Sequence, residues 1–386
     1  MGRGLPLWGG KLMKLLPVSM LLGVVLGSWA AAAQPQLCHV DVFRSGTEGY
    51  HTFRIPAIEA AGDGTLVAFA EARKYNAADP GMANNDIDLV MKRSTDGGAT
   101  WSPMQVIEDP GERWSAANPA TVLDRSTGRL WLLYLRGKPG RNTESARPGT
   151  DDVQTLARWS ADHGKTWSEP IDLTAVARDM NDPHWKVSVV GPGGGIQDGK
   201  GRLIFPVWKN APMQVFVIYS EDHGQTWHRG AVVPAKEPGD ENQLVELADG
   251  RLLMDFRQGR GPHRWLAESA DHGRTWSTPR PGIVVTPVCC AIERYWSRAA
   301  GDPADVIVWT GPKGPGRMNL VARLSYDEGK SFPDERPIAS GHAAYSDLTL
   351  LPGKVLGVLW ERGVEQGYQF ITFTRLEPGF IAPKPR

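Results

Sequence analysis

One arginine of this chain stands where a charge is hard to accommodate. Arg54 lies in the segment "HTFRIPAI", between Phe53 and Ile55, on what reads as an early strand. A guanidinium that is buried among apolar residues is destabilising unless an anion pairs with it. We therefore expect Arg54 to contact either a carboxylate from elsewhere in the chain or an anionic ligand.

The composition provides no broad field that would attract an anion to such a site. The 386 residues include 43 basic and 43 acidic side chains, and the sequence contains no basic run. This balance argues against a nucleic-acid-binding protein and against a protein of the membrane surface. An anionic ligand would therefore have to be bound by a local cluster of cationic side chains.

Five copies of one octet indicate the fold that must position such a cluster. The copies are "STDGGATW", "SADHGKTW", "SEDHGQTW", "SADHGRTW" and "SYDEGKSF", which start at residues 94, 160, 220, 269 and 325. Their mean spacing of about 58 residues suits a propeller blade of four strands better than a solenoid repeat. Residues 34–386 would hold about six such units. We therefore predict an all-β, six-bladed β-propeller of four-stranded antiparallel sheets as a single domain over 34–386.

The octets are expected at hairpin turns, because each follows a strand-like run and precedes polar or Pro-containing residues. Their Ser and Asp side chains can accept hydrogen bonds from turn amides, and the Gly at the fifth position supplies a positive φ. Dipeptides such as Asp63-Gly64 precede hydrophobic runs, and we expect the inner strand of each blade to follow such a turn. The octets carry His163, His223 and His272, but on separate blades, so we expect no metal site there.

The octets resemble the S-x-D-x-G-x-T-W Asp box of the sialidase superfamily, and "FRIP" around Arg54 resembles a signature of the same superfamily. The resemblance covers nearly the whole of residues 34–386. Asp boxes alone say little about function, because in that superfamily they are structural turns remote from the active site. Together the motifs imply an exo-α-sialidase, a glycoside hydrolase that removes terminal α-linked sialic acid from glycans, glycoproteins or glycolipids with retention, without metal or cofactor.

The resemblance implies that three arginines bind the carboxylate of the sugar. Their counterparts here are Arg54, Arg257 in "GRLLMDFRQ" and Arg317 in "GRMNLVARLS". A planar guanidinium donates two parallel hydrogen bonds to a carboxylate and stays charged at any working pH. Glu361 in "VLWERG" matches the acidic residue that orients Arg54. Arg73 in "EAR" matches a further arginine near the 4-hydroxyl of the sugar.

The resemblance also assigns the catalytic roles. Tyr345 in "SGHAAYSDLTL" matches the nucleophile, and Glu241 in "GDENQLVELADG" matches its base. A sialic acid carries a carboxylate on its anomeric carbon, which repels a carboxylate nucleophile but not a neutral phenol. The acid lies among Asp79, Asp86 and Asp88, and we favour Asp79 because its spacing from the FRIP and EAR segments resembles that of the family. Its loop, "NAADPGMANND", is longer than the family's consensus.

Two alternatives and one subsite stay open at this point. A sialic-acid-binding lectin on the same propeller would need the arginines but not the Tyr, Glu and Asp, whereas a trans-sialidase would need all of them. The N-acetyl group of a sialic acid is expected to contact apolar and aromatic loop residues, for which Trp114, Trp185 and Trp296 are candidates without assigned places.

The N-terminal residues have the pattern of a secretory signal peptide. Arg3, Lys11 and Lys14 precede the apolar run "LLPVSMLLGVVLGSWA" and the small residues "AAAQ". The run is short for a membrane span and is interrupted by Pro and Gly. We predict a signal peptide over 1–33, cleavage near Ala33, no stable membrane span afterwards, and export to the periplasm or the medium.

The cysteines are too few for a disulfide framework or a zinc site. They are Cys38, Cys289 and Cys290. The sequence allows either one bridge from Cys38 to a member of the adjacent pair or free thiols.

Overall fold

Strands dominate the part of the chain that the structure, a computed structural model, describes, namely residues 1–2, 9–10 and 37–382. The predicted signal peptide, 1–33, lies outside the described residues except at four positions. None of the described helices is long and apolar enough to cross a membrane. The prediction of an all-β protein is confirmed for residues 37–382.

The strands of residues 37–382 form four hydrogen-bonded sheets, which we divide into six successive sets of antiparallel neighbours. The first set comprises β2 (Thr52–Ala60), β3 (Leu66–Arg73), β4 (Ile87–Ser94) and β5 (Gln105–Glu108). The second comprises β6 (Ser115–Asp124), β7 (Arg129–Gly137), β8 (Val153–Ser160) and β9 (Ile171–Asp172). The third comprises β10 (Val187–Val190), β12 (Ile196–Gln197), β13 (Leu203–Asn210), β14 (Gln214–Ser220) and β15 (His228–Arg229).

The remaining sets follow in chain order, apart from the last strand. The fourth comprises β16 (Gly239–Glu246), β17 (Leu252–Gln258), β18 (His263–Ser269) and β19 (Arg280–Val284). The fifth comprises β20 (Ala291–Trp296), β21 (Val306–Pro312), β22 (Met318–Ser325) and the first half of β23 (Asp334–Leu351). The sixth comprises the second half of β23, β24 (Val355–Gly363), β25 (Phe370–Leu376) and β1 (His39–Arg44). Short elements are β11 (Gly193–Gly194), α1 (Thr174–Ala177), η1 (Arg298–Ala300), η2 (Pro352–Lys354) and α2 (Pro378–Ile381).

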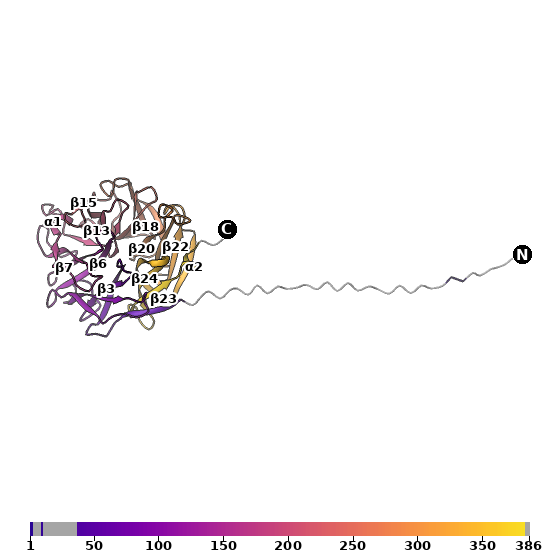
Figure 1. Ribbon diagram of the computed structural model, residues 1–386, viewed down its shortest axis with the longest axis horizontal. Coiled ribbons are helices and arrows are strands. Elements are labelled where there is room, and N and C mark those ends of the chain that lie inside the picture. Colours follow the sequence, from indigo (N-terminus) through magenta and orange to yellow (C-terminus); the bar gives the residue numbers. More distant parts are fainter. Residues whose placement is uncertain (3–8, 11–36, 383–386) are drawn as a thin grey trace. The chain divides into compact units, whose positions relative to one another are not determined.

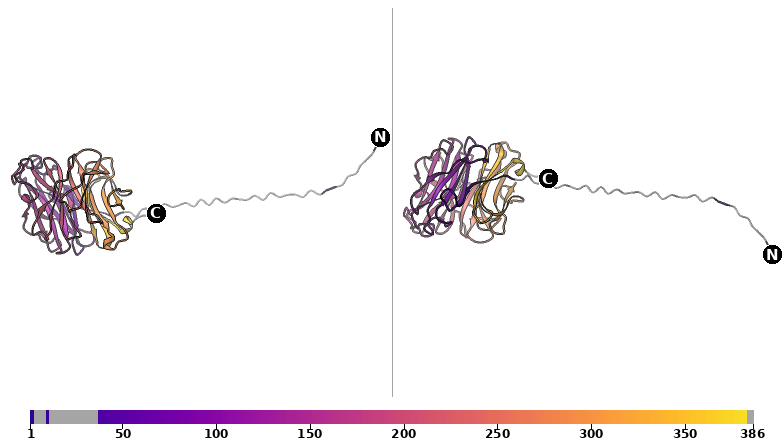
Figure 2. Two further views of the ribbon diagram at one scale, coloured as in Figure 1. Left: turned by 90° about the horizontal axis from the view of Figure 1, so that it is seen from above. Right: turned by 90° about the horizontal axis from the view of Figure 1, so that it is seen from below.

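The two ends of the described unit meet in the sixth set. Strand β1 pairs antiparallel with β25, and His39 lies opposite Thr374. Figure 1 shows the sheets side by side, with the indigo N-terminal strand against the yellow C-terminal strands, and Figure 2 shows the same neighbours from two further sides. This pairing joins the last strands of the unit to its first one, so that β25 is not left as an open edge.

One buried carboxylate joins the first strands of the first, fourth and sixth sets and the short strand β11. Asp347 of β23 accepts hydrogen bonds from the backbone amides of Ile58 (2.8 Å) and Gly194 (3.0 Å) and from Nε2 of Gln243 (2.9 Å). These partners belong to β2, β11 and β16, which are far apart in the sequence. Asp347 therefore fixes where the inner strands lie relative to one another.

The octets form hairpin turns, as predicted. In the first copy, the Gly98 amide donates to Oγ of Ser94 (2.9 Å), and the Thr100 amide donates to Oδ1 of Asp96 (3.0 Å). The same two bonds recur in the other four copies. Nε1 of Trp101 closes the turn on the carbonyl of Gly98. Beyond the Gly at the fifth position, the residue at the fourth position also has a positive φ, for example 60° at His163.

The predicted order of strands around the Asp-Gly turns is wrong. The turn at Asp63-Gly64 separates β2 from β3, so the strand before the turn is the first of its set and "TLVAFAEAR" belongs to the second strand. The reason is that β2 supplies one of the hydrogen bonds to Asp347, from the Ile58 amide, and so lies next to the first strands of other sets. Both strands are apolar, so hydropathy does not distinguish the inner one from its neighbour.

Two partly buried glutamates, Glu59 and Glu293, should make the free energy of unfolding depend on pH. Burial, together with the neighbouring carboxylates, raises the pKa of Glu59 to about 7 and that of Glu293 to about 8, from an ordinary value of 4.5. The folded state therefore holds protons that the unfolded state has released, and the free energy of unfolding should fall as pH rises from 4.5 to about 8. Thermal melting across this range should show a shallower decline for Glu293→Gln than for wild type. Glu237→Gln, at an exposed glutamate, serves as the control, and an unchanged slope for Glu293→Gln would refute the interpretation.

Candidate active site

A cavity of about 480 Å³ gathers residues that are distant in the sequence. The residues predicted for the site that line it are Arg54, Arg73, Asp79, Glu241, Arg257, Arg317 and Tyr345. Its volume lies within the range of small-molecule sites. The last predicted residue, Glu361, lies behind the lining and is fully buried.

The charge on Arg54 is paired inside the protein and also faces the cavity. Its Nε donates to Oε1 of Glu361 at 2.5 Å, and only 8% of the residue is exposed. The same carboxylate accepts hydrogen bonds from the amides of Ile55 (3.0 Å) and Tyr345 (3.2 Å). Strand β2 bulges after Arg54, where Ile55 has a φ of 60°, and this bulge turns the Ile55 amide toward Glu361. The first alternative, a carboxylate from elsewhere in the chain, is therefore confirmed for Arg54, and contact with an anionic ligand stays a prediction.

Tyr345 lies at the centre of the three predicted carboxylate-binding arginines. Its hydroxyl donates to Oε1 of Glu241 and accepts a hydrogen bond from Nη1 of Arg257 at 3.0 Å. The guanidinium carbons of Arg54 and Arg317 each lie 5.4 Å from the centre of its ring. The cavity therefore has one buried phenol that contacts one carboxylate and three guanidinium groups.

The electrostatics of this cluster keep the phenol protonated before any ligand binds. Burial raises the pKa of Tyr345 well above 10, and the Glu241 charge raises it further, whereas Arg257 and Arg54 oppose the rise. Burial disfavours the charge on Arg257, but the carboxylate of Glu241, 2.6 Å from Nη1, raises its pKa overall. Burial and the adjacent Glu241 also raise the pKa of Asp240 to about 7. A neutral phenol beside an available base is the arrangement that nucleophilic attack by an oxygen requires.

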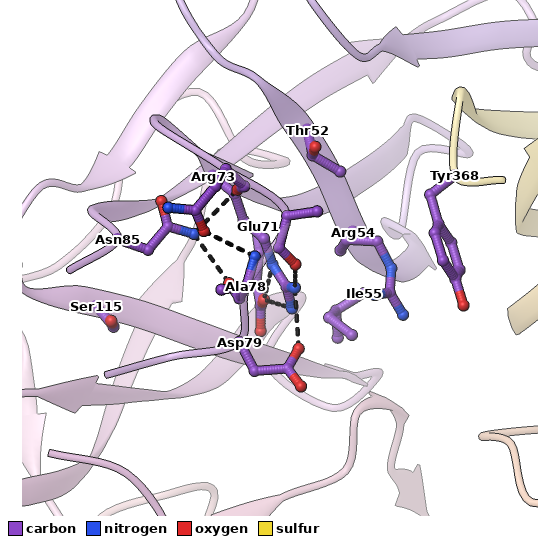
Figure 3. A network of polar contacts seen from close by, with 12 residues as sticks. Thr52, Arg54, Ile55, Glu71, Arg73, Ala78, Asp79, Asn85, Ser115 and Tyr368 are labelled. Carbon is purple, nitrogen blue, oxygen red and sulfur yellow. Dashed lines mark hydrogen bonds and ion pairs between the residues drawn. The ribbon is translucent and has the colours of Figure 1, made fainter. Parts of the chain in front are cut away.

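Asp79 lies on the loop between β3 and β4, where its side chain is 66% exposed. Figure 3 shows Arg73 pointing at it, with Nη1 of Arg73 2.9 Å from Oδ1 of Asp79. Arg73 is itself held by Glu71, whose Oε2 accepts from Nη2 at 2.7 Å. Asn85, 1% exposed, donates to the carbonyls of Asn76 and Ala78 and holds this loop in place. The loop therefore presents a carboxyl group at the cavity.

The other two candidates for the acid lie away from the cavity lining. Asp86 is 1% exposed, and its carboxylate accepts from the backbone amide of Arg113. Asp88 is 3% exposed and accepts from the hydroxyl of Tyr50 at 2.5 Å. Because neither lines the cavity, the geometry favours Asp79 among the three.

The apolar side of the cavity was not predicted correctly. Trp208 and Met213 line it, together with Leu135 and several valines, whereas Trp114, Trp185 and Trp296 do not. Trp185 instead packs against Phe216, with ring centres 5.5 Å apart. Trp208 lies on β13 in the segment "RLIFPVWKN", whose continuous apolar run has no alternation that would show which face meets the cavity.

The His and Cys residues are separate from the cavity. The three His residues of the octets each lie beside one carboxylate, His163 by Asp63, His223 by Asp124 and His272 by Asp198. Within the described residues, no three His, Cys, Asp or Glu side chains gather in a way that could hold a metal ion. All three cysteines are free thiols, Cys38 exposed and the adjacent pair buried, which excludes the predicted alternative of a bridge in this structure.

Residues 64–358 match the family model described as a BNR repeat-like domain. A sialidase from Micromonospora viridifaciens is 31% identical over 366 residues, which cover 88% of this chain and 54% of that protein. A sialidase from Paraclostridium sordellii is 31% identical and is matched over 70% of both chains. The chain thus spans about half the length of the Micromonospora protein.

Solved structures agree in fold. The Hadza microbial sialidase Hz136 has a TM-score of 0.77 and 26% identity, with 86% of this chain and 67% of that chain covered. An intramolecular trans-sialidase from Ruminococcus gnavus has a TM-score of 0.75 at 19% identity, with 90% and 99% covered. A Trypanosoma rangeli sialidase in complex with 2,3-difluorosialic acid, described as a covalent intermediate, has a TM-score of 0.69 at 20% identity, with 88% and 58% covered.

Proposed function

The chain belongs to the sialidase superfamily of glycoside hydrolases, with a BNR repeat-like domain, and from this membership we propose that it is an exo-α-sialidase. The proposed reaction is hydrolysis of terminal α-linked sialic acid from glycans, glycoproteins or glycolipids. The observation that carries the proposal is the contact of Tyr345 with Glu241 and with Arg54, Arg257 and Arg317. A cavity for a neutral sugar would have no need of three guanidinium groups around one phenol.

Arg54, Arg257 and Arg317 bind the carboxylate of the sugar in this proposal. All three line the cavity, and the first two are already oriented by Glu361 and Glu241. Because these ion pairs hold the guanidinium groups before substrate arrives, less conformational entropy is lost on binding. These three arginines gathered around one phenol would also explain how a chain with no net charge binds an anion.

Tyr345 is the proposed nucleophile, and Glu241 is its base. In the first step the phenolic oxygen forms a bond to the anomeric carbon, its proton passes to Glu241, and the bond to the leaving oxygen breaks. The proton moves along the hydrogen bond that already joins the two side chains. Arg257, which donates to the same phenolic oxygen, stabilises negative charge there. Water then attacks the same carbon, the tyrosine leaves, and the configuration is retained.

Asp79 is the proposed general acid that protonates the leaving oxygen and afterwards takes a proton from water. The change Asp79→Asn should lower kcat/KM on sialyllactose by about 10²–10³-fold. On an aryl sialoside with an acidic leaving group the loss should be much smaller, because that leaving group needs little protonation. Asp88→Asn is the matched control, a neighbouring acid outside the cavity lining. Equal losses on both substrates would remove Asp79 from this role.

The propeller fold, its bounds and the cellular location of the protein are also proposals. We infer that the six strand sets are the blades of a six-bladed β-propeller over 34–386, supported by the closure of β1 on β25 and by the relatives' fold. Export to the periplasm or the medium, after cleavage of residues 1–33, rests on the N-terminal pattern. The mechanism uses only side chains of this chain, so hydrolysis should persist with a chelator present.

Product analysis on sialyllactose tests the function. An exo-α-sialidase releases free sialic acid, and proton NMR during the first turnovers should show the α-anomer before mutarotation. Binding without release would identify a lectin. Sialic acid transferred to added lactose, or an anhydro product in place of free sugar, would identify a transferase and contradict the hydrolase.

A further inference from the structure

A second tyrosine, which is not among the residues that line the cavity, contacts two of the three arginines. Tyr368 follows β24, and its ring centre lies 3.9 Å from the guanidinium carbon of Arg54. Its hydroxyl accepts a hydrogen bond from Nη1 of Arg317 at 2.8 Å. Figure 3 shows the Tyr368 ring beside the Arg54 side chain. Tyr368 therefore contacts the guanidinium of Arg54 through its ring face and the guanidinium of Arg317 through its hydroxyl oxygen.

Several contacts fix the place of Tyr368. Its backbone has a φ of 60°, which few side chains other than glycine adopt without support, and Oγ of Ser45 donates to its carbonyl at 2.9 Å. His342 packs edge-on against the ring, with ring centres 4.9 Å apart and planes at 83°. The ring also packs against the buried cluster that contains Ile55 and Tyr345, so the strained backbone holds Tyr368 directly beside the predicted site.

Two neighbouring arginines need a residue that holds them in place, because their positive charges repel each other. Arg54 and Arg317 both approach the ring of Tyr345, and without a bound anion their charges repel each other. Arg54 has Glu361 as a counter-charge, whereas the hydrogen-bond acceptors of Arg317 within residues 37–382 are neutral, namely the Tyr368 hydroxyl and the carbonyl of Pro287 at 3.2 Å. The electron-rich ring face and the phenolic oxygen supply attraction to both cations without neutralising them.

We propose that Tyr368 is a positioning residue that holds Arg54 and Arg317 apart and aims them at the substrate carboxylate. This inference rests on the proposed function and deepens it. The carboxylate is present in the ground state and in the transition state, so misplaced arginines weaken the binding of both. Loss of the hydroxyl should therefore act on KM far more than on kcat.

The test compares Tyr368→Phe, which removes only the hydroxyl, with Tyr326→Phe, which removes the hydroxyl that donates to Asp334 outside the cavity. We expect Tyr368→Phe to raise KM for a sialoside by about tenfold with kcat within about twofold, and Tyr326→Phe to match wild type. In an Arg317→Met background, Tyr368→Phe should change KM little further, because the group that donates to its hydroxyl is already gone.

An unchanged KM for Tyr368→Phe would overturn the inference, as would full additivity with Arg317→Met. A joint fall of kcat and melting temperature without a KM effect would show a purely structural role and overturn it too. The exo-α-sialidase proposal has its own test, and it fails if the wild-type protein releases no sialic acid. In that event calorimetric titration of free sialic acid still compares wild type with Tyr368→Phe, and equal affinities would refute the positioning role.

Discussion

Tyr345→Phe is expected to lower kcat by about 10³-fold or more while the protein stays folded. The change removes one oxygen, the atom that would form the bond to the anomeric carbon. The ring stays between Arg54 and Arg317, and Arg257 keeps its ion pair with Glu241. Substrate affinity should therefore change far less than kcat. The measurement is steady-state hydrolysis of a fluorogenic sialoside beside a thermal melt.

The chain offers a closely matched control for this variant. Tyr134 is also fully buried, its hydroxyl donates to Glu108 at 3.0 Å, and Nε of Arg158 donates to it at 3.1 Å. This second Tyr, Glu and Arg group lies outside the cavity lining. Tyr134→Phe should lower the free energy of unfolding by about 1 kcal/mol and leave kcat intact. Comparable kcat losses in the two variants would show that Tyr345 has only a structural role.

Glu361→Ala is expected to destabilise the fold by about 3–5 kcal/mol and to abolish detectable hydrolysis. The reason is that one buried carboxylate serves the Arg54 guanidinium and the amides of Ile55 and Tyr345. Its removal leaves a buried cation without a counter-ion and frees both the anchoring arginine and the strand that carries the nucleophile. Denaturant unfolding gives the change in stability, and activity is measured under conditions where the variant remains folded.

Two further variants separate charge from shape. Glu361→Gln keeps the volume and one acceptor oxygen but removes the charge, and it should fall between wild type and Glu361→Ala in stability. Glu365→Ala, at an exposed residue of the next loop, should match wild type. A loss below about 1 kcal/mol for Glu361→Ala would mean that the ion pair with Arg54 contributes little to the fold.

The sequence predicted the cavity residues better than it predicted their surroundings. Arg54 stood out because a charge among apolar residues needs a partner. The other site residues were assigned from short segments that resemble those of the sialidase superfamily. Their partners are distant in the chain, as Arg54 and Glu361 are, so only the resemblance could connect them in advance. The octets indicated the strand repeat, and their hydrogen bonds are local enough to be read from eight residues.

Three features could not be predicted for identifiable reasons. Hydropathy does not separate β2 from β3, because both are buried on both faces. Trp208 could not be distinguished from the other tryptophans, since which face of β13 meets the cavity depends on packing between sets. Tyr368 sits in the loop "GVEQGYQ" with no periodic pattern, and its role is visible only from the two arginines that it contacts.

Trapping with 2,3-difluorosialic acid tests the central claim, that Tyr345 attacks the sugar. Fluorine beside the anomeric carbon slows the attack of water, and fluoride is a good leaving group in the first step, so a covalent intermediate accumulates. We predict that wild type gains the mass of one fluorosialyl group and that peptide mapping places it on Tyr345. The adduct should be absent from Tyr345→Phe and present in Tyr134→Phe. An adduct on Glu241, or turnover of sialosides with no adduct on Tyr345, would contradict the account.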